Sequence, residues 1–145
     1  VFGEYSFHKK SLIHTSIKNS LIGKEIKIFG DGSQIRNFIY VKDLVKILEK
    51  SFKLPSGIYN VSSLKSFSVN QFLKILKSIY PSSKIKYTSF NVGELKEVKI
   101  SNHKVMKKLR ISKKFFTDFR SAIIKTSNWY RKNLKNSVKY NPKIS

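Results

Sequence analysis

The sequence predicts an α/β fold, with one domain over residues 1–133 and a polar tail over residues 134–145. Apolar residues recur at helical spacing in several segments, and short extended runs bounded by turn residues lie between them. A length of 145 residues suits one domain, and a hydrophobic content of 40% is sufficient for a packed core.

The helices are predicted from apolar spacing and from residues typical of helix ends. Ser11 stands where the first helix begins, and Gly23 follows its end. Ser68 and Gln71 form a capping-box pattern for a later helix. The predicted helices cover residues 11–22, 41–52, 68–80 and 101–109, and a last one begins near residue 117.

Four extended runs lie between these helices, at residues 25–29, 34–40, 58–61 and 84–88. The first two flank the turn sequence Gly30-Asp31-Gly32-Ser33, so we expect a hairpin or a strand, loop, strand unit. The third, Ile58-Tyr59-Asn60-Val61, is bulky without clear alternation. This is typical of a strand buried on both faces of a parallel sheet.

Several classes of function are excluded or disfavoured by composition. The absence of cysteine excludes disulfides, thiolate zinc sites and a cysteine nucleophile. No apolar run is long enough to span a membrane, and we expect a soluble, cytoplasmic protein. His8, His14 and His103 lack the spacing of a metal site, and we expect them at the solvated surface. Glu94 and Glu97 are best explained as parts of a solvated loop.

The net charge of +22 makes nonspecific polyanion binding an alternative function. Almost all basic residues are lysines, which are scattered along the chain, and arginine occurs only at Arg36, Arg110, Arg120 and Arg131. Base-edge readout and phosphate forks favour arginine, so sequence-specific nucleic-acid binding is not expected.

Arg36 is the most informative residue, because it lies within an apolar extended run of a lysine-rich chain. Such a position favours a rigid bidentate donor to an anion. A structural salt bridge to a carboxylate explains the same residue equally well. The residues alone leave both interpretations open.

The segment around Arg36, GDGSQIRNFIYVKDLV, resembles the GDGxQxRDFIYVDDLV signature of extended short-chain dehydrogenase/reductases of the NAD-dependent epimerase/dehydratase family. The flanking segments VFGE, SLIHTSIKNSLIGKEIKIFG, GIYNVSSLKSFSVNQFLKIL and SAIIKTSNWY resemble family segments in the same order. The fold implied is the C-terminal substrate-binding portion of such an enzyme, with one or two elements of an incomplete Rossmann sheet.

The resemblance also implies a set of substrate-binding residues. Arg36 matches the arginine that binds the nucleotide diphosphate, and Leu12, after Ser11, matches a backbone contact to the same phosphates. Lys27 and Phe29 fall on the strand that lines the nucleobase, although an ordinary core position explains Phe29 equally well. Together these residues would form half of a binding site for a UDP- or dTDP-sugar.

Three positions depart from the family pattern. Asn37 replaces the usual aspartate after the arginine, and Lys42 replaces the first acid of the VDD run. Asn91 stands where many members place a second phosphate arginine. These departures weaken the prediction of tight diphosphate binding.

The family's glycine-rich cofactor turn and catalytic YxxxK correspond to positions ahead of residue 1. Tyr5 has Lys9 four residues later, but it follows the strand after the catalytic helix and does not match the catalytic tyrosine. The complete enzyme is expected to use NAD(P), whereas this chain alone is expected to bind no cofactor and to have no turnover.

Two further expectations follow from an incomplete Rossmann sheet. The apolar faces of residues 41–52 and 58–61 should stay exposed, or be covered by a separately encoded N-terminal Rossmann half or by self-association. A truncated remnant without function is a further alternative.

Overall fold

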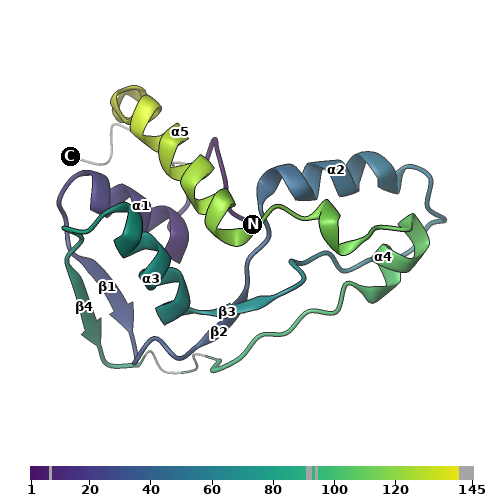
Figure 1. Cartoon of the computed structure of the whole chain (residues 1–145), viewed down its shortest axis with the longest axis horizontal. Helices are drawn as coiled ribbons and strands as arrows, with labels where there is room; N and C mark the ends of the chain where they lie inside the picture. Colours follow the sequence, from purple (N-terminus) through teal and green to yellow (C-terminus); the bar gives the residue numbers. More distant parts are fainter. Residues whose placement is uncertain (7, 91–92, 94, 141–145) are drawn as a thin grey trace.

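The computed structural model describes residues 1–6, 8–90, 93 and 95–140, with side chains described up to residue 134 (Figure 1). Within these residues the chain forms two lobes joined by a narrow pair of strands. The larger lobe contains the chain start, three helices and a parallel strand pair. The smaller lobe contains the remaining helices, on the other side of the strand pair.

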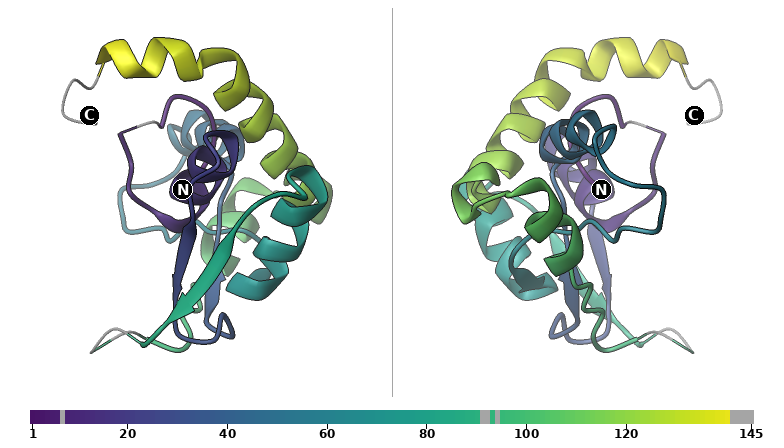
Figure 2. Two further views of the ribbon diagram at one scale, coloured as in Figure 1. Left: turned by 90° about the vertical axis from the view of Figure 1, so that its left-hand side faces the viewer. Right: turned by 90° about the vertical axis from the view of Figure 1, so that its right-hand side faces the viewer.

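The larger lobe contains a two-stranded parallel sheet. Strand β1 pairs with β4, with Ile26 opposite Ile85 and Phe29 opposite Thr88. Alternate residues of β1 are buried, as expected for a strand with one covered face. Helix α5 arches over the lobe, and it contacts α1 and α3 (Figure 2). The bounds are α1 Leu12–Leu21, β1 Ile26–Phe29, α3 Val69–Ile79, β4 Ile85–Thr88 and α5 Phe119–Tyr140.

Helix α3 begins with the predicted capping box. The Ser68 hydroxyl accepts from the Gln71 amide (3.1 Å), and the Gln71 side chain accepts from the Ser68 amide (2.8 Å). Val69, Phe72, Leu73 and Leu76 then lie on one side of the helix and are buried. Cap and apolar stripe together fix where α3 starts and which side packs inward.

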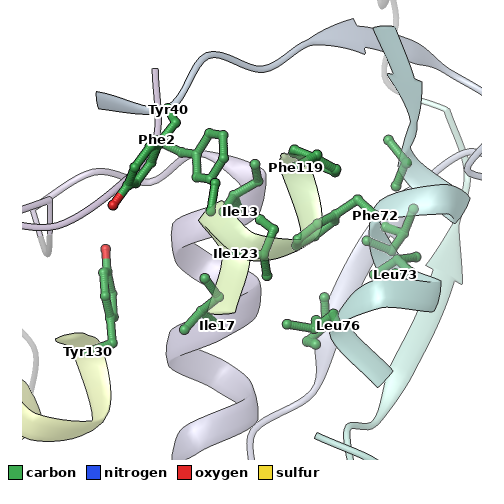
Figure 3. Close-up of a cluster of buried hydrophobic side chains, with 14 residues drawn as sticks. Phe2, Ile13, Ile17, Tyr40, Phe72, Leu73, Leu76, Phe119, Ile123 and Tyr130 are labelled. Atoms are coloured by element: carbon green, nitrogen blue, oxygen red, sulfur yellow. The ribbon is translucent and has the colours of Figure 1, made fainter. Parts of the chain in front are cut away.

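One continuous core fills the larger lobe (Figure 3). Side chains from α1, α3 and α5 meet there with Phe2 and Tyr40. Phe119 stacks on Phe67, with 4.1 Å between ring centroids, and packs edge-on against Phe2. The most buried members of this core are Ile17, Phe72, Leu76, Ala122 and Ile123.

The smaller lobe is reached through an antiparallel strand pair, β2 with β3, in which Arg36 lies opposite Phe67. Among the described residues, its buried core consists of Ile39, Ile47, Val105 and Ile111. The bounds are β2 Ile35–Asn37, α2 Val41–Ser51, β3 Ser66–Ser68, α4 His103–Leu109 and a 3-10 turn at Lys113–Phe115.

Asp43 ties the smaller lobe to the start of α5. Its buried carboxylate accepts from the Thr117 amide and from the Thr117 hydroxyl, both at 2.8 Å. The two hydrogen bonds give each carboxylate oxygen of this buried side chain a donor. The carboxylate thus fixes α2 against the chain that enters α5.

The outer face of α2, formed by Val45, Leu48 and Phe52, is exposed although it is apolar. These side chains are 45%, 52% and 91% exposed, and Ile58 just beyond the helix is 85% exposed. The expectation of uncovered apolar surface here agrees with the structure. No described element covers this face.

Of the two alternatives predicted for residues 25–29 and 34–40, the structure shows the strand, loop, strand unit and not the hairpin, because β1 pairs with β4 and β2 pairs with β3. One strand prediction is wrong. Residues 58–61 are not a strand, because no described strand lies beside them to accept their backbone hydrogen bonds. At the other end of the chain, α5 continues to Tyr140, beyond the predicted start of the tail at residue 134.

Candidate functional site

A cavity of about 730 Å³ lies between the start of α1, strand β1 and strand β2. All five described residues that the sequence predicts for substrate binding line this cavity: Ser11, Leu12, Lys27, Phe29 and Arg36. They come from three separate elements, so the fold brings together residues up to 25 positions apart in sequence. Asn91, the sixth predicted position, lies outside the described residues.

The start of α1 forms one wall of the cavity. Ser11 is the N-cap residue, with extended backbone angles, but its side chain makes no cap hydrogen bond. Its hydroxyl instead lies 2.5 Å from Nδ1 of His14. The first amides of α1 are therefore not satisfied by the Ser11 side chain, and the helix start favours an anion.

Strand β2 forms the opposite wall and carries Arg36. The Arg36 side chain is half-buried, and its Nη1 donates to the carbonyl of Ile35 (3.0 Å). That bond fixes one end of the guanidinium along the strand. The guanidinium is planar and carries five N–H donors in a fixed arrangement.

Strand β1 lines the cavity with Lys27 and Phe29, which alternate with buried residues and so lie on one face of the strand. Phe29 is 45% exposed, so it is not an ordinary core residue. Lys86 of β4 lies opposite Lys27 and adds a second cation to the same strand pair.

The charged residues that line the cavity are mainly basic. They are Lys10, Lys27 and Arg36, against the single described carboxylate of Glu25. Three cations around this cavity raise the local concentration of anions and favour a ligand with more than one negative charge.

Two of the departures from the family pattern have structural partners. Lys42 pairs with Glu4, with 3.0 Å between Nζ and Oε1, and Tyr40 also donates to Glu4 (2.9 Å). Burial raises the pKa of Glu4, but hydrogen bonds, including those from Lys42 and Tyr40, outweigh it and leave the pKa below its ordinary value. The Asn37 side chain accepts from the Ile100 amide (3.0 Å), so it connects β2 to the segment between β4 and α4.

His14 and Gln34 contribute to this site but were not predicted. The expectation that His14 lies at the solvated surface is wrong, because it is 1% exposed. Burial, together with Lys9, the N-terminus and His8, lowers its pKa to about 4, so the ring is neutral at pH 7. Gln34 lies within the quoted motif, is buried, and donates to the Phe29 carbonyl.

Other chemistry is not supported by the described part of the chain. No three His, Cys, Asp or Glu side chains gather there in a way that would hold a metal ion. Tyr5 is exposed and packs beside Trp129, with 4.8 Å between ring centroids. No helix in the described ranges is long and apolar enough to cross a membrane.

Comparison with solved structures defines the class of fold. The structure matches a UDP-glucose 4-epimerase from Thermotoga maritima, solved with UDP-glucose, with a TM-score of 0.82 and 23% identity over 92% of this chain and 44% of that one. It also matches a dTDP-glucose 4,6-dehydratase from Bacillus anthracis with NAD, with a TM-score of 0.80 and 21% identity over 92% and 43%. The fold is therefore that of part of an extended short-chain dehydrogenase/reductase.

Sequence comparison points to the same family. Residues 1–62 match the model of the NAD dependent epimerase/dehydratase family. The chain is 31% identical over 116 residues to a UDP-glucuronate 4-epimerase from Thermodesulfobacterium geofontis, covering 77% of this chain and 35% of the relative. It is 30% identical over 151 residues to a dTDP-glucose 4,6-dehydratase from Salmonella typhimurium, covering 95% and 41%.

These comparisons confirm the resemblance predicted from the sequence: the chain is similar to part of the NAD-dependent epimerase/dehydratase enzymes. It spans well under half the length of these relatives, between 35% and 41%.

Proposed function

We propose that the cavity between α1, β1 and β2 binds the nucleoside diphosphate part of a UDP- or dTDP-sugar. The observation that carries this proposal is the convergence of Ser11, Leu12, Lys27, Phe29 and Arg36 on one cavity of about 730 Å³. That volume lies within the usual range for small-molecule sites, roughly 300 to 1,000 Å³.

Each wall has a role in this proposal. The Arg36 guanidinium and the first amides of α1 bind the diphosphate from opposite sides, as fixed donors to a doubly charged group. Lys27 adds long-range attraction from β1, and the exposed ring of Phe29 offers a flat apolar contact to the base. The half of the ligand that carries charge thus lies near the cations.

In the whole protein, we propose, this site serves NAD(P)-dependent conversion of the sugar. The residues of this chain do not fit the dinucleotide itself, because the sequence contains no glycine-rich turn between a buried strand and a helix. It also offers no Tyr-x-x-x-Lys pair at the expected place for proton transfer. We assign this chain substrate binding and no step of the redox reaction.

We further propose that the outer face of α2 contacts the N-terminal Rossmann half that such an enzyme requires. The exposed apolar side chains of Val45, Leu48 and Phe52 form a surface whose contact with water costs about 25 cal/mol per Å². The relatives contain more than half of their length beyond the part matched here. Self-association through the same face would replace this contact if that half is absent.

The test is titration of the chain with UDP by calorimetry, comparing wild type with Arg36→Ala. Loss of a charge-assisted hydrogen bond of roughly 1.5 to 3 kcal/mol should weaken binding about tenfold to a hundredfold. The matched control is Arg120→Ala, which removes the same charge from an exposed arginine bonded to Ser78.

Nonspecific polyanion binding, which the charge of +22 favours, predicts a different result. The two arginine substitutions would then have equal effects, and the affinity would fall steeply with salt. Equal losses for Arg36→Ala and Arg120→Ala would overturn the proposed function.

A further inference from the structure

At the start of α1, the exposed Ser11 contacts the buried His14, which the proposed function does not use. The Ser11 hydroxyl lies at the cavity, and 2.5 Å from it lies Nδ1 of His14, whose ring is almost fully buried. The other ring nitrogen, Nε2, is also buried and has no hydrogen-bond partner among the described residues. The position of the proton on the His14 ring decides whether the Ser11 hydroxyl can donate a hydrogen bond into the cavity.

A neutral imidazole carries one N–H, so two arrangements are possible. If Nε2 carries the proton, Nδ1 must accept the hydroxyl hydrogen of Ser11. The buried N–H at Nε2 then has no acceptor, and Ser11 has no hydrogen left for a ligand. If Nδ1 carries the proton, it donates to the Ser11 oxygen, and Nε2 is left as a buried acceptor without a donor.

The second arrangement is favoured on two grounds. Buried N–H groups without an acceptor are rarer in proteins than buried acceptors without a donor. Furthermore, the charged groups that act on the ring are cations, Lys9, His8 and the N-terminal amine, so no carboxylate stabilises a proton at Nε2. Both considerations place the single proton on Nδ1.

We propose that His14 is a positioning residue that turns the Ser11 hydroxyl into a hydrogen-bond donor to an anion in the cavity. Nδ1–H of His14 occupies a lone pair of the Ser11 oxygen, and the hydroxyl hydrogen remains for a ligand oxygen. Ser11 and the first amides of α1 then all donate in the same region. As far as the ligand is a nucleoside diphosphate, this inference rests on the proposed function.

The proton position can be measured without any ligand. Long-range ¹H–¹⁵N NMR of the wild-type chain at pH 7 distinguishes a protonated from an unprotonated ring nitrogen. We expect His14 to show Nδ1–H, although imidazole free in water slightly favours Nε2–H. A protonated Nε2 in His14 would overturn the inference.

The consequence for binding is tested with UDP. Ser11→Ala should weaken UDP binding about tenfold, the lower end for a hydrogen bond to a charged group. Ser11→Thr, which keeps a hydroxyl, should restore most of the affinity. His14→Phe should weaken binding several-fold, and adding Ser11→Ala to it should cost much less than Ser11→Ala costs in wild type, because the two residues act as a unit.

His103→Phe is the matched control, since it changes an exposed histidine outside the cavity and should leave binding unchanged. Additive losses for Ser11→Ala and His14→Phe would overturn the inference. Nδ1–H in a chain that does not bind UDP would overturn the proposed function and retain the proton arrangement. UDP binding by a chain with Nε2–H would retain the proposed function and overturn the proton arrangement.

Discussion

The two lobes use similar elements but differ in how completely they bury them. In the larger lobe, α1, α3 and α5 enclose one core, and Ile17, Phe72 and Ile123 have no exposed surface. The smaller lobe contains α2 (Figure 1). This helix buries Ile47, whereas Leu48 and the C-cap residue Phe52 are exposed. A helix with apolar residues on two sides requires partners on both.

The closed core and the uncovered apolar face lie on different lobes. The cavity lies on the larger lobe and on β2, where the core is closed. The uncovered apolar face lies on α2 of the smaller lobe. The proposed substrate-binding cavity and the proposed partner-binding face therefore lie on different regions of the molecule, and each can be perturbed separately.

The largest expected effect is loss of packing in the larger lobe. Phe72→Ala removes a fully buried ring and should lower the free energy of unfolding by about 3 to 5 kcal/mol. Phe52→Ala, the same change at a 91% exposed position, should alter it by less than about 0.5 kcal/mol. Urea unfolding of both variants provides the comparison, and equal losses would show that the lobes are packed alike.

The second largest effect on stability is expected at the contact between Asp43 and Thr117, which connects the lobes. Asp43→Ala leaves the Thr117 amide and hydroxyl without their acceptor and should destabilise the chain by about 2 to 3 kcal/mol. Thr117→Ser keeps both donors and should cost less than about 1 kcal/mol. Equal stability of Asp43→Ala and wild type would mean that this carboxylate does not hold α2 against α5.

The buried His14 predicts a pH dependence in the larger lobe. Its pKa rises from about 4 in the folded chain to about 6.5 on unfolding, so the unfolded chain binds the extra proton as the pH falls. Stability should therefore be greatest above pH 6.5 and should fall by about 2 kcal/mol between pH 7 and pH 5.

The carboxylate of Glu4 does not account for a loss in this range, because its pKa lies below the ordinary value of 4.5. His14→Phe should flatten the profile between pH 7 and pH 5 when unfolding is measured at each pH. A slope that survives this substitution would assign the proton uptake to another group.

The smallest effect on stability is expected on the outer face of α2. Leu48→Lys exposes no core and should change the free energy of unfolding by less than about 0.5 kcal/mol. The same substitution should reduce self-association measured by sedimentation at rising concentration, because it places a charge on the apolar face. Thr15→Lys on α1 is an exposed control on the other lobe. Unchanged association of Leu48→Lys would mean that this face does not mediate contacts.

Helix positions were well predicted because their signals are local. The box at Ser68 and Gln71, the left-handed Gly23 after α1, and the apolar spacing of α2 all lie within a few residues of the element they define. Strand pairing is not local. Alternation predicted the extended runs at β1, β2 and β4, but it predicted neither β3 nor which strands pair, because the partners lie far apart in the chain.

The cavity residues were predicted from a motif, whereas the buried His14 that contacts Ser11 was not predicted. Arg36 was singled out by its isolation among lysines, and the family signature extended the set to Leu12 and Lys27. His14 lies seven residues before Leu21 and therefore on the same side of the helix. Its immediate neighbours, Ile13 and Thr15, do not mark it as buried. Its burial results from packing against Tyr130 of α5, more than a hundred residues later.

The central claim, that the cavity between α1, β1 and β2 binds a nucleoside diphosphate, is tested most directly by mapping where UDP binds. NMR of the ¹⁵N-labelled chain during titration with UDP at physiological salt should shift the amides of Leu12, Lys27 and Arg36 together, with one dissociation constant. Shifts spread over lysines of both lobes, or none at these three amides, would contradict it.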